Sequence, residues 1–202
     1  GNVRPMTLTA GDGGKSTGTF ELNTNETIGN YAFYSCPNLT EGEFGNSVAK
    51  IGDGAFGYCG FTEVTIPASV EVLGKNAFYY NDSLKTVDFE ADSKLTTIGD
   101  YAFRNCTSLE SVYIPDGVTK IGSVVLYQAN ANTVLSVATG SYAESYAKEN
   151  NIQYTTLVLD SIENQIYTGE EIRPYVGASA NGKRLSLDTE YTVDYKNNMV
   201  QS

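Results

Sequence analysis

The segment Ile98–Lys120 reads IGDYAFRNCTSLESVYIPDGVTK, and three other segments follow the same pattern. They read IGNYAFYSCPNLTEGEFGNSVAK at Ile28–Lys50, IGDGAFGYCGFTEVTIPASVEV at Ile51–Val72 and LGKNAFYYNDSLKTVDFEADSKLTT at Leu73–Thr97. Each begins with an Ile-Gly or Leu-Gly pair, and a further pair at Ile121 gives a period of about 23 residues. A fixed period of roughly 20–29 residues predicts a solenoid of leucine-rich repeats.

Each unit is predicted to contain one short strand. Triplets of the form V-x-I, such as Val112–Ile114, alternate as a strand with one buried face requires. Pro67 and Pro115 directly follow two of these triplets and end the strands, because proline has no N–H to donate to a ladder. The Gly of each Ile-Gly pair is predicted to form a tight corner. The Ala-Phe pair, Ala102–Phe103 in the fourth unit, is predicted to fill the opposite, convex side.

One unit alone buries too little apolar surface to be stable. Full burial of a large apolar side chain contributes roughly 1.5–3 kcal/mol, whereas ordering one residue costs about 1–2 kcal/mol in backbone entropy. Stacking several units into one core is therefore required. Two units depart from the pattern: Gly42–Gly45 replaces V-x-I-P, which predicts a weak or bulged strand, and extra residues around Ala91–Thr97 predict a loop.

The full pattern I-G-x-x-A-F-x-x-C-x-x-L-x-x-V-x-I-P-x-x-V resembles the BspA-like class of leucine-rich repeats. The resemblance runs from Ile28 to about Leu157. It implies a repeat solenoid of short parallel strands with turns and little helix. It also implies a bacterial protein that is secreted or displayed on the cell surface, where such proteins act in adhesion and in protein or glycan binding, without shared catalytic residues.

The pattern decays after Ile121, and the segment SYAESYAKENNIQY resembles the closing element of this repeat family. Ser141 and Glu144 form a Ser-x-x-Glu capping box, which predicts the start of a helix. The apolar residues of this helix, Ala143, Tyr146 and Ala147, lie on one predicted face. The helix is predicted to end at Asn150–Asn151. We expect this helix to cover the last apolar layer, as terminal repeats require.

We therefore divide the chain into three parts. Residues 1–27 are predicted to form an N-terminal cap or partial repeat, and residues 28–157 the solenoid with its helical C-terminal cap. Residues 158–202 change to alternating strand patterns, in which IYTGEEIRPYV and DTEYTVDYKNN look like the front half of a bacterial immunoglobulin-like module. Because a complete sandwich needs about 100 residues, this part is predicted to be a truncated all-β immunoglobulin-like segment.

The charge of the chain argues against two classes of partner. Its net charge is −11, from 13 basic and 24 acidic residues, whereas nucleic acids and anionic membrane surfaces attract positive charge. No apolar run approaches the roughly 20 residues of a membrane span. The Gly-Lys-Ser at Gly14–Ser16 is not a phosphate-binding loop, because Thr9 stands where that motif requires its first glycine.

Catalysis and metal binding find little support in the residue types. The chain has no histidine, which removes Ser-His-Asp and Cys-His catalysis and most zinc sites. Cys36, Cys59 and Cys106 share one repeat position, where the remaining full unit has Asn81. A Cys36–Cys59 disulfide or a metal site is possible there, but small buried thiols fit better because the repeat sets the position and one cysteine is left over. We predict that the protein is not an enzyme and binds no cofactor.

The outward-facing residues of the strands are the predicted ligand-binding site. Strand parity places one set of side chains on the concave sheet: Glu41, Glu43, Glu63, Thr65, Thr86, Asp88, Ser111 and Tyr113. No enclosing wall is predicted around these carboxylates, and no calcium-binding loop pattern is present, so neither glycosidase chemistry nor a calcium site is favoured. Solenoids bind macromolecules through such surfaces, so we expect a protein or glycan ligand.

Two questions stay open from the sequence. Tyrosines recur near the turns, where they either contribute to an interface or complete the core; they are Tyr31, Tyr34, Tyr58, Tyr79, Tyr80 and Tyr101, with Tyr113 on the strand. The alternative function is a structural spacer that displays other domains of a larger surface protein.

Overall fold

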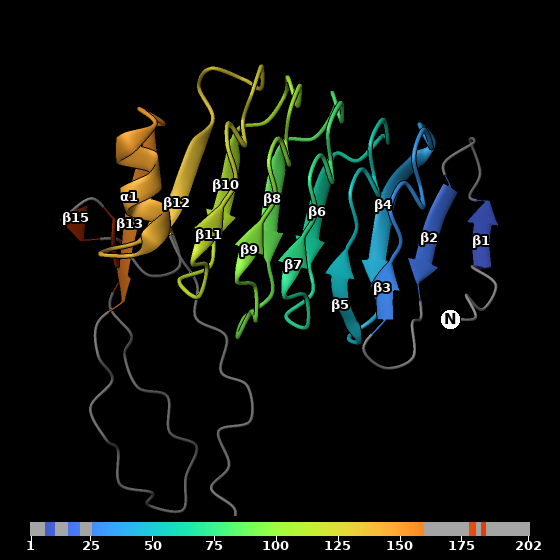
Figure 1. Ribbon diagram of the computed structural model, residues 1–202, viewed down its shortest axis with the longest axis horizontal. Coiled ribbons are helices and arrows are strands. Elements are labelled where there is room, and N and C mark those ends of the chain that lie inside the picture. The colour runs from blue at the N-terminus through green and yellow to red at the C-terminus, as the bar shows by residue number, and fades with distance from the viewer. Residues whose placement is uncertain (1–6, 11–15, 21–25, 160–177, 181–182, 185–202) are drawn as a thin grey trace, which may run out of the picture. The chain divides into compact units, whose positions relative to one another are not determined.

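A computed structural model describes most of the repeat region and short pieces on either side of it. The described residues are 7–10, 16–20, 26–159, 178–180 and 183–184. The chain divides into two compact units, Gly1–Tyr154 and Thr155–Ser202. The first unit contains the repeats, each of which forms one coil of a solenoid (Figure 1).

Two rows of parallel strands run along the first unit (Figure 1). The strands formed by the V-x-I triplets are adjacent in the order β6 (Glu63–Ile66), β8 (Thr86–Phe89), β10 (Ser111–Ile114) and β12 (Val134–Ala138). The second row is formed at the Ile-Gly corners by β3 (Glu26–Ile28), β5 (Val48–Ile51), β7 (Val72–Leu73), β9 (Thr97–Ile98) and β11 (Lys120–Ile121). The predicted strands are confirmed, but the second row was not predicted from the sequence.

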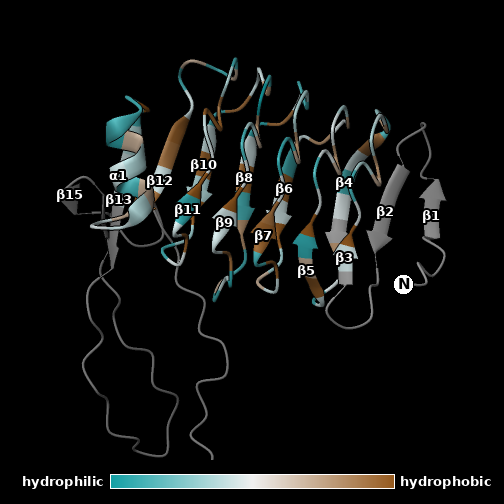
Figure 2. Cartoon of the chain, viewed as in Figure 1, coloured by the Kyte–Doolittle hydropathy of each residue, from teal (hydrophilic) through white to brown (hydrophobic). Residues whose placement is uncertain are grey.

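Equivalent residues of successive coils lie in register. Val64 pairs with Val87, Val87 with Val112, and Val112 with Leu135. In β6, β8, β10 and β12 buried residues alternate with more exposed ones, as the period of two predicts. Figure 2 shows the same alternation of hydrophobic and hydrophilic residues recurring from coil to coil.

The core contains a column of phenylalanines, one from each Ala-Phe pair. The ring of Phe56 stacks on Phe33 at 5.2 Å and on Phe78 at 5.3 Å, and Phe78 stacks on Phe103 at 6.1 Å. Phe56, Phe78 and Phe103 are buried, together with the alanines that precede them. The Ala-Phe pairs of the second to fourth coils therefore belong to the core, as the sequence predicts, whereas in the first coil Ala32 is exposed and Phe33 is half-buried.

From the second coil onward, the glycine of the Ile-Gly or Leu-Gly pair is required by the closeness of the coils. A Cβ added at Gly99 would lie 2.5 Å from the backbone nitrogen of Lys75, and one added at Gly122 would lie 2.3 Å from that of Asp100. Gly52 and Gly74 are equally crowded by the preceding coil, and none of these four glycines has a positive φ. The corner thus depends on the absent side chain, not on a special backbone conformation.

A third set of backbone hydrogen bonds joins the turn segments, which run from the Ile-Gly pair to the cysteine position of each coil. In the fourth coil, the N–H groups of Tyr101, Phe103 and Asn105 donate to carbonyls of the next coil at 3.2, 3.0 and 2.9 Å. Tyr101 and Asn105 have positive φ angles of 56° and 57°. Residues at the same two positions are left-handed in the other coils as well, so this backbone geometry is part of the repeat.

The cysteine position also holds adjacent coils together. The thiols of Cys59 and Cys106 donate to the carbonyls of Phe33 and Phe78 at 3.1 and 3.2 Å. Asn81 donates its amide N–H to the equivalent carbonyl, that of Phe56, at 2.8 Å. A short buried donor is therefore what the repeat requires, and the amide of Asn81 supplies it where the other coils have a thiol.

All three thiols are free, and the buried-thiol interpretation is confirmed for Cys59 and Cys106. Burial raises the pKa of each of these two thiols to about 12. Cys36 is half-buried.

The N-terminal strands pair differently from those of the later coils. β1 (Thr7–Ala10) is antiparallel to β2 (Ser16–Phe20), which is parallel to β4 (Leu39–Phe44). Ser16 pairs with Leu39 and Thr17 with Glu41, so Thr40 is an extra residue in β4. The bulge predicted for this strand is confirmed, although it lies at the start of the strand and not at Gly42–Gly45.

The repeat closes with α1 (Tyr142–Glu149), as predicted. The hydroxyl of Ser141 accepts the N–H of Glu144 at 3.1 Å, and the Glu144 carboxylate accepts the N–H of Gly140 at 2.7 Å, one residue earlier than a capping box predicts. The predicted apolar face is buried, and the Tyr146 hydroxyl donates to the carbonyl of Gly122 at 3.1 Å. No helix in the described ranges is long and apolar enough to cross a membrane.

In the second unit, β13 (Tyr154–Leu159), which starts at the boundary, is antiparallel to β14 (Ala178–Ala180), and β14 is antiparallel to β15 (Lys183–Arg184). Most of the predicted immunoglobulin-like segment, 158–202, lies outside the described residues. That assignment stays a prediction.

The phenylalanine column should carry much of the stability. Replacing Phe103 with alanine removes a fully buried ring, so we expect the free energy of unfolding to fall by about 3–5 kcal/mol. Urea unfolding followed by circular dichroism would measure this fall. Thr107→Ala, at an exposed position of the same coil, is the control and should change stability by less than about 0.5 kcal/mol. An unchanged midpoint for Phe103→Ala would contradict the repeat register.

The crowded corner makes a second prediction. Gly99→Ala places a methyl group against the backbone of the preceding coil, so we expect it to destabilise the protein by about 1–3 kcal/mol through overpacking. Gly29→Ala is the matched control, because a Cβ at Gly29 meets nothing within 4 Å. Equal midpoints of thermal unfolding for the two variants would show that the coils are not packed this closely.

Candidate functional site

The strand face is the surface formed by the outward-pointing residues of β4, β6, β8 and β10. Four of the predicted ligand-binding residues are exposed there: Glu41, Glu63, Thr65 and Asp88. Three others are half-buried: Thr86, Ser111 and Tyr113. The side chain of Glu43 lies outside the described part. The parallel ladder brings the residues of β6, β8 and β10 into one surface, because Glu63 pairs with Thr86, and Thr86 pairs with Ser111.

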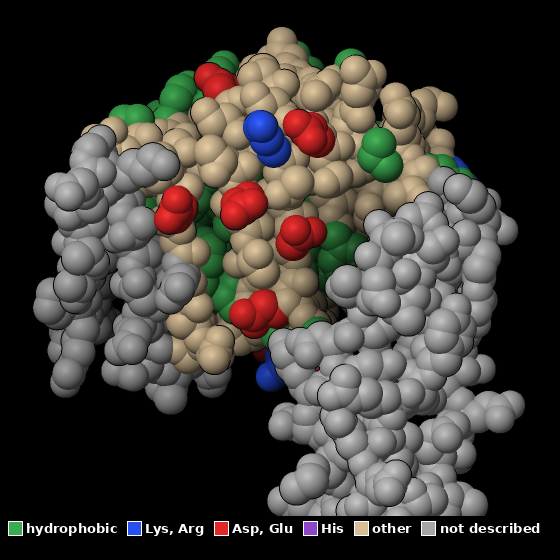
Figure 3. Space-filling model, turned by 180° about the vertical axis from the view of Figure 1, so that it is seen from behind, with side chains coloured by type: hydrophobic (Ala, Val, Ile, Leu, Met, Phe, Trp, Pro, Cys, Tyr) green, Lys and Arg blue, Asp and Glu red, His purple; other side chains and the backbone are tan. Residues whose placement is uncertain are grey.

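The strand face is acidic. Figure 3, which views the protein from behind, shows acidic side chains gathered over the coils with few basic ones among them. Among the described residues, the ion pair that forms is Lys148–Glu144 on α1, and the strand-face carboxylates that the structure describes, Glu41, Glu63 and Asp88, form no ion pair there. Because like charges crowd together without compensation, this face attracts cations.

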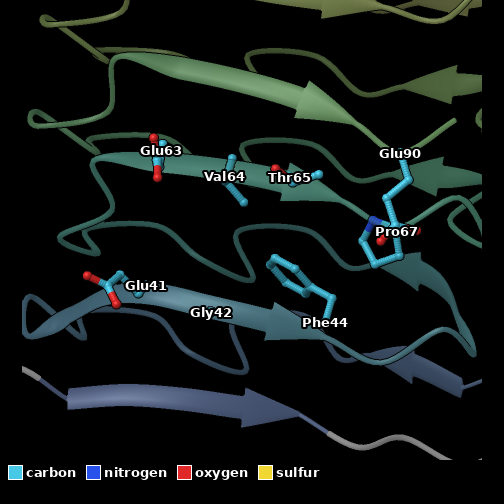
Figure 4. A pocket seen from close by; sticks show the side chains of 8 residues that line it. All are labelled: Glu41, Gly42, Phe44, Glu63, Val64, Thr65, Pro67 and Glu90. Atoms are coloured by element: carbon cyan, nitrogen blue, oxygen red, sulfur yellow. The ribbon is translucent and has the colours of Figure 1, made fainter. Parts of the chain in front are cut away.

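A groove lies on this face between β4 and β6. Its volume is about 390 Å³, and its lining comprises Glu41, Gly42, Phe44, Glu63, Val64, Thr65, Pro67 and Glu90. Figure 4 shows Glu41 and Glu63 at the same end of the two strands, and the ring of Phe44 lying between the strands. Glu90 and Pro67 lie at the other end. The groove thus has an apolar floor and carboxylates at both ends.

The groove exists because the strand ladder is interrupted. β4 belongs to the sheet of β1 and β2, whereas β6 begins the row that runs through β8 and β10. Two irregularities coincide here: the bulge at Thr40 in β4, and a corner before β6 that is one residue shorter than its equivalents. The sequence C-G-F-T-E-V at Cys59–Val64 corresponds to C-T-S-L-E-S-V at Cys106–Val112.

The shortened corner depends on Gly60. A Cβ at this position would lie 2.1 Å from the carbonyl oxygen of Pro37, so a larger residue does not fit. The Gly60 N–H donates to the carbonyl of Leu39 at 3.0 Å. Phe61 is fully buried in place of the usual leucine. The missing residue is visible in the sequence, but its consequence for the pairing of β4 with β6 was not predicted.

Glu90 takes the position at which two other coils have proline, Pro67 and Pro115. Its carboxylate accepts the backbone N–H of Ala68 at 3.0 Å, and this bond fixes the side chain at the end of the groove. In chemical terms the groove is an open surface site with an aromatic floor and three carboxylates, of which that of Glu90 is held by a hydrogen bond. No cluster of three or more metal-ligating residues occurs in the ranges that the structure describes.

Comparison with known proteins agrees with the architecture. A family model described as BspA type leucine rich repeat region, with six copies, matches residues 22–168. No curated protein sequence matches the chain.

Two solved structures are similar to it. The pneumococcal vaccine antigen PcpA is 30% identical with a TM-score of 0.53, and the match covers 56% of this chain and 28% of PcpA. A leucine-rich repeat protein from Bacteroides ovatus is 16% identical with a TM-score of 0.30, and that match covers 76% of this chain and 66% of the other. The chain therefore spans less than a third of the length of PcpA. The repeat that opens at Ile28 and recurs to Ile121 is a BspA-type leucine-rich repeat, and the chain belongs to that family.

Proposed function

We propose that this chain is a non-enzymatic binding module of an extracellular or cell-surface protein. Its ligand is a macromolecule, and the binding surface is the strand face. Membership of the BspA-type family supports a role in adhesion or binding. The description of PcpA as a vaccine antigen supports exposure at a bacterial surface.

The observation that carries the proposal is the set of carboxylates on the strand face that have no basic partner within the described chain. Glu41, Glu63 and Asp88 are exposed on strands whose backbones are fixed by ladders. Charged groups of the same sign on a fixed backbone lose little backbone entropy when a ligand binds. They select a ligand of the opposite charge. The ligand class that fits best is a protein with a basic surface.

The groove refines this ligand class. Lysine and arginine have apolar stems and charged heads, so such a side chain can lie on Phe44 with its head at Glu41 and Glu63. Neutral glycans would not use these charges. The strand face therefore favours a basic protein segment over a neutral sugar chain.

The test is a binding screen against extracellular-matrix proteins and a glycan array with two charge-matched variants. Glu63→Lys/Asp88→Lys reverses two charges on the strand face, and we expect it to weaken a protein hit about tenfold or more. Glu71→Lys/Glu149→Lys makes the same change in net charge at exposed positions outside the strand face, and should bind like the wild type.

Equal losses in both variants would show that only net charge matters and would contradict a localised site. A folded protein that binds nothing in the screen would favour the spacer function instead.

A further inference from the structure

A second surface lies on the turn segments of the first three coils. It consists of five tyrosines, here called the tyrosine cluster: Tyr31, Tyr34, Tyr58, Tyr79 and Tyr80. Tyr31, Tyr34 and Tyr58 are 58%, 43% and 40% exposed, and the other two are half-buried. The tyrosines near the turns therefore do not complete the core, and their ring surfaces face solvent in part.

The rings form one connected group. Tyr34 contacts three others, with centroids 5.8 Å from Tyr31, 5.6 Å from Tyr58 and 6.0 Å from Tyr79. Tyr58 stacks on Tyr80 at 4.6 Å and meets Tyr79 edge-on at 5.2 Å. Burial and the neighbouring phenols of Tyr80 and Tyr34 raise the pKa of Tyr58, so the ring surface stays uncharged at neutral pH.

Glycines in the second coil make room for two of these rings. A Cβ at Gly57 would lie 2.2 Å from Cε1 of Tyr79, and a Cβ at Gly54 would lie 2.5 Å from Cε1 of Tyr31. The two rings thus lie directly against the backbone of a neighbouring coil. No other residue type would allow this approach.

The backbone also fixes the rings. Tyr31, Tyr58 and Tyr80 have positive φ angles of 56°, 57° and 56°, a conformation that is rare for large side chains. Their N–H groups donate to carbonyls of the next coil at 2.8, 2.9 and 2.8 Å, which holds them in place. A preorganised aromatic surface loses little conformational entropy on binding, as in the tyrosine-rich surfaces of antibodies.

The next coils show what such rings bind. Arg104 occupies the repeat position of Tyr34 and Tyr79, and its guanidinium lies over the rings of Tyr101 and Tyr127, 5.8 and 5.4 Å from their centroids. The Lys75 ammonium lies 5.9 Å from the Tyr101 centroid.

In the part of the chain that the structure describes, no basic side chain lies over a ring of the tyrosine cluster itself. Burial raises the pKa of Tyr58 most, and of the two charged side chains that act on it, Arg104 lowers this pKa and the exposed carboxylate of Asp82 raises it. At one end of the solenoid, cations of the chain itself thus lie over the tyrosine rings. At the other end, the ring faces of the tyrosine cluster are open to a cation from a partner.

We propose that the tyrosine cluster is a second docking surface, and that its occupant is a segment of a partner protein that presents arginine or lysine to the rings. Cations are attracted to aromatic faces, and more strongly where water is excluded. A neutral sugar chain is a poorer fit, because it carries no positive charge for the ring faces to attract. This surface is independent of the strand face.

The test measures the binding of a hexa-arginine peptide by isothermal titration calorimetry. Tyr34→Leu/Tyr58→Leu keeps apolar bulk but removes two aromatic faces, so we expect Kd to rise about tenfold. Tyr142→Leu is the matched control, because Tyr142 is 45% exposed on α1, outside the cluster, and should leave Kd within about twofold. The single variant Tyr34→Leu serves if the double variant does not fold.

A strand-face variant separates this proposal from the proposed function. Glu63→Gln/Asp88→Asn should leave most of the tyrosine-dependent binding intact. If only that variant weakens the binding of hexa-arginine, and the tyrosine variants bind it as the wild type does, the tyrosine cluster is not the docking surface.

Two further outcomes overturn the proposal. One is that hexa-arginine does not bind, and the other is that a neutral hexasaccharide binds in its place and is lost in the tyrosine variants.

Discussion

The backbone hydrogen bonds between equivalent residues of adjacent coils are the constraint on which this structure depends. They run along the two strand rows and along the turn segments, so the coils from the second onward are held at three places. The close spacing that results excludes a side chain at Gly74, Gly99 and Gly122. It also stacks the phenylalanines and places a short donor, cysteine or asparagine, against the phenylalanine carbonyl of the preceding coil. The residues that recur in the repeat are those that these contacts require.

The sequence predicted the parts of the fold that hydrophobic periodicity and capping rules describe. The strands at the V-x-I triplets, the burial of Phe103 and the apolar face of α1 are examples. Periodicity does not report on interactions between coils that involve only the backbone. This is why the second strand row, whose members β7, β9 and β11 have only two residues each, and the left-handed turn positions were not predicted.

The candidate site was predicted in part for the same reason. Strand parity identified Glu63, Thr65 and Asp88 as outward-facing, because alternation alone decides that. The groove depends on a missing residue before β6 and an extra one in β4, and their combined effect appears only when two coils are placed side by side. Similarly, the ring contacts of Tyr31 and Tyr79 depend on glycines of a neighbouring coil. Whether the strand face binds a ligand stays a proposal.

The interruption between β4 and β6 has a mechanical consequence. The row of β3 and β5 and the turn segments continue across it, whereas on the third side the backbone bond from Gly60 to the carbonyl of Leu39 joins the two coils at the start of β4. Fewer backbone hydrogen bonds therefore resist separation of these two coils on this side than on the other two. The two walls of the groove thus belong to coils that no strand ladder joins, so the spacing of the walls is set by the core and by the other two sides.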